Sequence, residues 1–105
     1  MKKGIELKQH FHTCMPLFIA LGDEIRLTII EALTDEALLN VREITERTSL
    51  SRPAVSHHLK ILKTAGLIDV HREGTCNYYY LSIEDSTRKL MQLGHLLESV
   101  LSMDA

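Results

Sequence analysis

Residues 51–68 read SRPAVSHHLKILKTAGLI, and this stretch decides the fold. Ser51 is a favourable helix N-cap, and Pro53 falls in the first turn, where a missing backbone N–H costs no hydrogen bond. Gly66 suits the end of a helix. The stretch therefore predicts a helix from Arg52 to about Ala65. Its apolar residues recur at helical spacing on one face, and they are Val55, Leu59 and Leu62, supported by Ala54, Ile61 and Ala65.

A short helix precedes this one. Asn40 is a good N-cap, and Glu43 three residues later completes a capping box, in which each side chain bonds the other residue's amide. This helix is predicted to begin at Val41 and end at about Arg47. Residues 48–51 then form a tight polar turn, so residues 41–65 predict a helix-turn-helix.

The pattern continues on both sides of the helix-turn-helix. Apolar residues recur every three or four positions over residues 5–21, at Leu7, Phe11, Cys14 or Met15, Phe18 and Leu21. Pro16 within this helix can kink or divide it. Asp23 is placed to cap a second helix, and residues 34–40 connect it to the next element.

Downstream, residues 67–73 and 76–82 predict two strands around a Gly74-Thr75 turn. A last helix covers residues 84–102, and its apolar face consists of Leu90, Leu93, Leu97, Val100 and Leu101. The fold class is therefore mainly α with a small β-hairpin, in the order α-α-α-α-β-β-α. This is a winged helix-turn-helix, with the wing over residues 67–82. The length of 105 residues favours a single domain over 1–105.

Composition and charge set broad limits. The chain is 45% hydrophobic and 25% charged, as in an ordinary globular protein, and its formal net charge is −2. Residues 41–75 nevertheless carry a net +2, while residues 1–40 and 76–105 carry −2 each. This distribution is a weak electrostatic indication of a small DNA-binding protein, and a net-neutral enzyme can show it by chance. No signal peptide or apolar segment long enough to span a bilayer is present, so we expect a cytoplasmic protein without membrane contact.

The helix from Arg52 presents its polar side chains on the face opposite the apolar stripe. Residues near the N-terminal end of such a helix approach base edges in the major groove, whereas those farther along meet phosphates. The predicted base readers are Ser51, Arg52, Ser56 and His57. The predicted phosphate contacts are Lys60 and Lys63, with Arg72 from the wing. His58 faces the Ala54 and Ile61 side of the helix, so we expect it to pack against neighbouring elements.

These segments resemble the ArsR/SmtB family of bacterial repressors. The similarity is carried by residues 41–44 and 51–68, and its most specific part is residues 54–62. Leu21–Leu27 resembles the opening of the family's second helix, and Tyr78–Leu81 resembles its second wing strand. The resemblance implies operator binding, a homodimer built from the first and last helices, and ligand-controlled release of DNA.

The wing departs from the family pattern. Its tip is Gly74-Thr75-Cys76-Asn77, where the family often has an additional arginine. Arg72, helped by His71, Thr75 or Asn77, is left to contact phosphate or the minor groove, which predicts a modest contribution from the wing.

The effector stays open at this point. Metal ligation is one alternative, either by Glu84, His95 and Glu98 on the last helix or by His10 and Cys14 on the first, although both sets are short of a full ligand set. Oxidation of Cys76 in the wing is a second alternative. The third is that there is no effector. The two cysteines are expected to be thiols rather than a disulfide.

The terminal helices, 5–21 and 84–102, have apolar faces that one small chain cannot fully cover, which predicts a homodimer that presents two recognition helices to double-stranded operator DNA. The alternative function is a winged-helix module that binds protein without specific DNA binding. A small hydrolase using Cys14 or Cys76 with a histidine is disfavoured because no nucleophile elbow is present. We expect no enzymatic activity and no cofactor.

Overall fold

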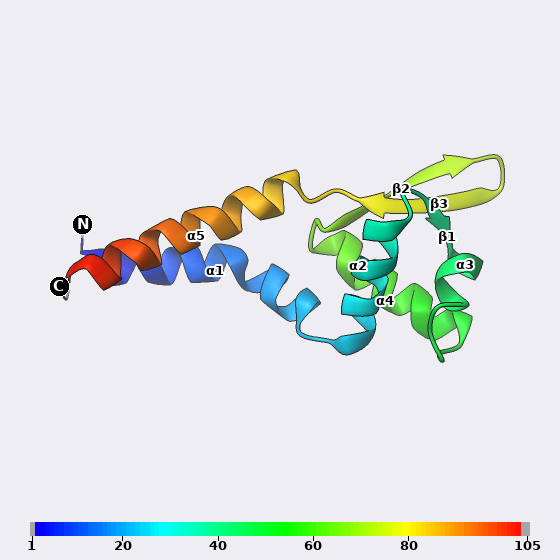
Figure 1. The fold of residues 1–105 in the computed structure, drawn as a ribbon, viewed down its shortest axis with the longest axis horizontal. Helices are drawn as coiled ribbons and strands as arrows, with labels where there is room; N and C mark the ends of the chain where they lie inside the picture. The colour runs from blue at the N-terminus through cyan, green and yellow to red at the C-terminus, as the bar shows by residue number, and fades with distance from the viewer. Residues whose placement is uncertain (1, 104–105) are drawn as a thin grey trace.

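The computed structural model describes residues 2–103, and Figure 1 shows its arrangement. An elongated pair of helices extends from a small body that holds the remaining elements. The elements, in chain order, are α1 (Lys3–Leu21), α2 (Glu24–Asp35), β1 (Leu39–Asn40), α3 (Val41–Thr45), α4 (Arg52–Thr64), β2 (Ile68–Glu73), β3 (Cys76–Leu81) and α5 (Glu84–Met103). The predicted winged helix-turn-helix is confirmed, with element ends within two residues of those expected.

One strand was not predicted. The three-stranded antiparallel sheet has the order β1-β3-β2, because Leu39 pairs with Tyr79 and Asn40 with Tyr78. The sequence placed these two residues in a connection. A two-residue strand is too short to show alternation, and its partner lies about forty positions farther along the chain, so no local pattern indicates it.

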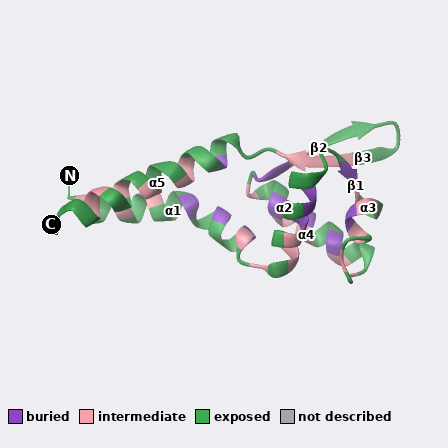
Figure 2. Cartoon of the chain, viewed as in Figure 1, coloured by how far each residue is buried: buried purple, intermediate pink, exposed green. Residues whose placement is uncertain are grey.

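The hydrophobic core joins the elements of the body (Figure 2), and Leu17 and Ala20 of α1 belong to it as well. α4 contributes the predicted stripe, since Val55, Leu59 and Leu62 are all buried. Ile44 of α3 and Ile29 of α2 are fully buried against it. Because this apolar stripe fixes the inner face of α4, it also fixes which side chains face outward.

The helices α1 and α5 form what we call the arm. They run side by side near the two chain termini and diverge toward the body (Figure 1). Lys3 Nζ donates to Ser99 Oγ at one end, and the buried Cys14 Sγ donates to the Lys89 carbonyl at 3.5 Å. The helix α1 is continuous through Pro16.

The buried face of α1 agrees only in part with the periodic set that the sequence suggests, because Cys14 is the one fully buried member of that set. The buried residues of this helix are Cys14, Leu17 and Ala20, whereas Phe11, Met15 and Phe18 remain 38–45% exposed. On α5 the predicted apolar face is likewise divided, because Leu93 is buried while Leu97 and Leu101 are exposed. Both helices of the arm therefore keep apolar surface that this chain does not cover. Among residues 2–103, no helix combines the length and apolar character needed to cross a bilayer.

Leu62 gives a test of this core. We expect Leu62→Ala to lower the free energy of unfolding by about 2–5 kcal/mol, because it leaves a cavity under α4. Urea denaturation at a fixed protein concentration measures the change. The matched control is Leu27→Ala on α2, where the side chain is 43% exposed and the loss should stay within about 0.5 kcal/mol. Equal losses in the two variants would contradict the assigned core.

Candidate nucleic-acid interface

Both ends of α4 are fixed by local hydrogen bonds. At its start the Ser51 hydroxyl accepts from the Ala54 amide at 3.4 Å. At its end Gly66 adopts φ +81°, and the Leu67 amide donates to the Leu62 carbonyl at 3.0 Å. This is a Schellman ending, which turns the chain sharply into β2. The predicted cap and terminating glycine are both confirmed, so the length and position of α4 follow from its own sequence.

The short helix α3 braces the start of α4. The predicted capping box forms, with Asn40 Oδ1 accepting from the Glu43 amide and Glu43 Oε1 accepting from the Asn40 amide, both at 2.9 Å. Ile44 is fully buried. In the turn that follows, the Leu50 amide donates to the Thr48 hydroxyl at 3.2 Å. A five-residue helix is thereby held in place by both its cap and its core contact.

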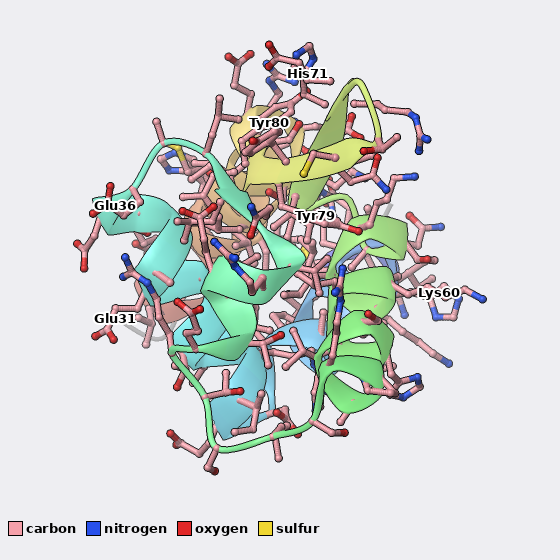
Figure 3. All side chains as sticks on the ribbon, turned by 90° about the vertical axis from the view of Figure 1, so that its right-hand side faces the viewer. Glu31, Glu36, Lys60, His71, Tyr79 and Tyr80 are labelled. Atoms are coloured by element: carbon pink, nitrogen blue, oxygen red, sulfur yellow. The ribbon has the colours of Figure 1, made fainter. Side chains whose placement is uncertain are left out.

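The outward face of α4 carries every residue predicted from this helix to meet DNA. All of them are exposed, and they are Ser51, Arg52, Ser56, His57, Lys60 and Lys63. Lys60 extends away from the body into solvent (Figure 3). No carboxylate lies on α4 itself. The structure thus places these side chains on one accessible surface.

His58 does not share that surface. Its Nδ1 lies 3.1 Å from a terminal nitrogen of Arg26, a residue of α2. The Arg26 side chain is 11% exposed, and it also donates to the Ala20 carbonyl at 2.6 Å and to the Ile19 carbonyl at 3.1 Å. We call this set of contacts the Arg26 clamp. It connects the end of α1, the start of α2 and the middle of α4, and the bracing role predicted for His58 is consistent with it.

Asp23 also contacts Arg26. Its carboxylate caps α2 by accepting from the amides of Ile25 at 2.9 Å and Arg26 at 3.1 Å. The backbone hydrogen bond from Arg26 lowers the pKa of Asp23 below its ordinary value of 3.8, and the nearby Arg26 guanidinium lowers it further.

The wing is exposed from His71 through Asn77. Gly74 takes φ +62° at the turn, which a side chain would disfavour. Arg72 donates to Asn77 Oδ1 at 3.5 Å across the hairpin, and His71 lies 3.9 Å from Glu73 (Figure 3 labels His71). The Cys76 sulfur raises the pKa of the adjacent Tyr78 phenol, and partial burial raises it further. Arg72 is thus accessible but already pairs with a neighbour.

A cleft of about 380 Å³ lies between α3, the start of α4 and the wing. Its lining residues are Asn40, Val41, Arg42, Arg52, Thr75, Cys76 and Asn77. Arg42 was not among the predicted contacts, yet it shares this cleft with Arg52. Its guanidinium is exposed and lies 3.8 Å from Glu46. The signal available in the sequence was its position near the start of the first helix of the helix-turn-helix, where an outward arginine adjoins the same surface.

The effector alternatives find only partial support in the geometry. Within residues 2–103, no three histidine, cysteine or acidic side chains come close enough to hold a metal ion. His95 pairs with Glu98 at 3.7 Å, and His10 Nδ1 bonds the Glu6 carbonyl at 2.9 Å. Both cysteines are free thiols, as expected, with Cys14 buried and Cys76 exposed. Metal and thiol sensing therefore both stay predictions.

Known proteins are similar to this chain in sequence and in fold. A family model described as "Bacterial regulatory protein, arsR family" matches residues 23–70. An uncharacterized HTH-type transcriptional regulator of Methanocaldococcus jannaschii is 33% identical over 85 residues, which are 81% of this chain and 94% of that protein. The transcriptional activator HlyU of Vibrio cholerae is 32% identical over 92 residues, 88% of this chain and 83% of HlyU.

Two solved structures are also similar. The structure of reduced HlyU from Vibrio cholerae has a TM-score of 0.71 and 31% identity, and the match covers 87% of this chain and 95% of that one. A homodimeric winged helix-turn-helix DNA-binding domain from Mycobacterium bovis, described as a possible ArsR-family regulator, has a TM-score of 0.67 and 27% identity. That match covers 89% of this chain and 85% of the other.

The cap at Asp23 predicts a specific pH dependence. Because its pKa is lower in the folded chain, the ionised carboxylate stabilises the fold above pH 3.8, and this stabilisation is lost as the pH falls through the folded pKa. We expect Asp23→Asn, which keeps an acceptor oxygen but cannot titrate, to show a smaller fall in melting temperature over that acidic window. Thermal melts followed by circular dichroism measure it. The control Asp35→Asn, at the other end of α2, should follow the wild type, and an Asp23→Asn profile identical to wild type would refute the assignment.

Proposed function

Since this chain belongs to the arsR family of bacterial regulatory proteins and is a DNA-binding transcriptional regulator, we propose that it acts as a homodimeric repressor whose α4 reads an operator in the major groove. The observation that carries the proposal is the outward face of α4, where polar and basic side chains lie on a helix whose opposite face is buried. Such a regulator works in the cytoplasm, where the chromosome is accessible.

The roles along α4 follow from position. The major groove is roughly 12 Å wide and admits one helix, whose first residues come nearest the base edges. Arg52 has the fork of donors that suits guanine, while Ser51, Ser56 and His57 can donate or accept. Lys60 and Lys63 lie farther along the helix and suit the phosphate backbone.

The cleft beside the wing extends this surface. Arg42 and Arg52 line it together, and Thr75 and Asn77 face them from the hairpin. A phosphate of the flanking backbone fits this combination of guanidinium and polar donors. Arg72 from the wing adds a further cation nearby. The proposed interface therefore includes Arg42 in addition to the residues that the sequence indicated.

The arm supports the proposed dimer. Large apolar side chains stay exposed on both of its helices, including Phe11 and Phe18 on α1 and Leu97 and Leu101 on α5. An apolar surface of this kind on a small protein is typical of an interface. A two-fold axis through the arms would present the two α4 helices to successive major grooves, which are about 34 Å apart.

Regulation by an effector is part of the proposal, because the family resemblance implies ligand-controlled DNA release. The three alternatives are a metal ion, oxidation of Cys76 and the absence of an effector. A titration of DNA binding with a panel of divalent metals and with peroxide tests the first two, because each condition changes a different group. If no condition changes the affinity, metal sensing and thiol sensing are both ruled out.

The proposed readout by α4 can be measured by fluorescence anisotropy with duplexes from the DNA upstream of the protein's own gene. We expect Arg52→Ala to weaken binding by about 5- to 150-fold, corresponding to 1–3 kcal/mol, and to relax sequence preference at one position. The matched control is Arg88→Ala on α5, which removes the same charge from an exposed site away from α4 and should leave the affinity unchanged.

Salt dependence separates the two classes of contact. Lys63→Ala should weaken binding to all sequences alike and reduce the slope of log affinity against log salt by about one. Binding that is insensitive to salt, or an affinity unchanged by Arg52→Ala together with Ser56→Ala, would rule out the proposed readout. That result would favour the alternative of a winged-helix module that binds protein.

Introducing carboxylates into the exposed apolar surface of the arm tests the proposed dimer. We expect wild type to sediment at twice the chain mass, and Phe11→Glu with Leu97→Glu to shift it toward the monomer, because carboxylates would be buried without partners. The control is Leu38→Glu, which places the same charge at an exposed leucine outside the arm. A wild-type monomer at micromolar concentration, or a double variant that remains dimeric, would contradict the assigned interface.

A further inference from the structure

A groove of about 630 Å³ separates the C-terminal half of α1 from α4. Its lining residues are His12, Met15, Pro16 and Ile19 from the first helix, and His57, Lys60, Ile61, Thr64 and Ala65 from the α4 side. Its volume lies within the range of about 300–1,000 Å³ that is usual for small-molecule sites.

The apolar side chains that line the groove are exposed to solvent. Ile19 is 62% exposed and Met15 is 45% exposed, although both adjoin the partly buried Ile61. Pro16 and Ala65 extend the same surface. Aliphatic side chains exposed to this degree favour a ligand with an apolar body, because its binding removes their surface from water.

Lys60 is the one charged side chain among the residues that line the groove, where it lies with the polar side chains of His12, His57 and Thr64. No aspartate or glutamate lines the groove. Lys60 is exposed and directed into solvent (Figure 3), and it forms no ion pair within residues 2–103. This charge complementarity favours an anionic head group and disfavours a cation.

We propose that this groove binds a small amphipathic organic anion, such as a medium-chain carboxylate, and that binding weakens the grip of α4 on DNA. The second part rests on the function proposed above. His57 and Lys60 line the groove and also belong to the predicted DNA-contacting face. An anion held by Lys60 neutralises a charge that would otherwise meet a phosphate, so the ligand and DNA compete for the same side chains.

The binding test uses the full-length protein without DNA. Decanoate below its micelle concentration is titrated into the labelled protein, and amide shifts are followed by NMR. We expect saturable shifts centred on Ile19 and Ile61. Decyltrimethylammonium, which has the same tail and the opposite charge, should bind at least about tenfold more weakly.

Variants locate the site. Ile19→Glu should weaken decanoate binding at least about tenfold, because it adds a carboxylate to the groove floor, whereas the matched control Leu38→Glu should bind as wild type. Circular dichroism melts check that both variants fold, and sedimentation checks their oligomeric state. If Ile19→Glu instead produces monomers, the occupant of the groove is a second copy of the chain and the proposal is overturned.

A final measurement connects the groove to DNA. Saturating decanoate should weaken operator binding by wild type at least about tenfold and leave Ile19→Glu unaffected. The proposal is overturned if decanoate shows no saturable binding, if both head groups bind equally, or if DNA affinity is unchanged when the groove is full. Because the ligand titration contains no DNA and the operator titration can be run without ligand, failure of the groove and failure of the DNA-binding function are distinguishable.

Discussion

The geometry of the molecule depends on the Arg26 clamp. Its guanidinium donates to carbonyls at the end of α1, lies beside the cap of α2 at Asp23 and contacts His58 in the middle of α4. The end of α1 carries the negative pole of its dipole and has carbonyls that no following turn can satisfy, so a planar cation with several donors suits the position. The clamp thereby joins the arm to the helix that faces outward.

The junction between arm and body matters because a dimeric DNA-binding protein fits its operator at only one separation of its two recognition helices. If two arms pair about a two-fold axis, the separation of the two α4 helices is fixed by the angle between arm and body in each copy. Core packing fixes α4 within the body, since Val55, Leu59 and Leu62 are buried. The core also reaches the end of α1 through Leu17 and Ala20, but the two helices of the arm diverge as they approach the body (Figure 1). Hydrogen bonds to Arg26 provide directional contacts across this junction.

How much was predictable depends on the range of the interactions involved. The ends of α4 and the capping box at Asn40 and Glu43 were predictable, because caps and terminal glycines act within a few residues. The strand β1 was not predictable, because its two residues form a strand only by pairing with Tyr78 and Tyr79, which lie far along the chain. The Arg26 clamp was missed for the same reason, although the inward direction of His58 was visible from helical periodicity.

The residues of the candidate site were likewise predictable only where local interactions determine their position. Residues of α4 could be assigned to the outward face from the position of the apolar stripe alone, and the structure exposes all of them. Arg42 could not be joined to Arg52 without the turn that brings α3 beside the wing. Likewise, periodicity in α1 indicated an apolar helix but not which apolar residues the body would leave uncovered. Of the predicted repeat, Cys14 is buried while Phe11, Met15 and Phe18 stay exposed, and Leu17 and Ala20, which the repeat did not include, are buried with Cys14.

The position of the groove constrains how any occupant could act. An effector held at a distance from α4 must act through a change of shape, and its effect is then limited by the difference in its affinity for the two shapes. Lys60 and His57, in contrast, belong to the groove and to the outward face together. Occupancy by an anion would therefore oppose DNA even in a rigid molecule, and by reciprocity DNA would oppose the anion to the same degree. The groove would thus need no movement at the Arg26 clamp to act, and the clamp would be free to keep the spacing of the two reading helices constant.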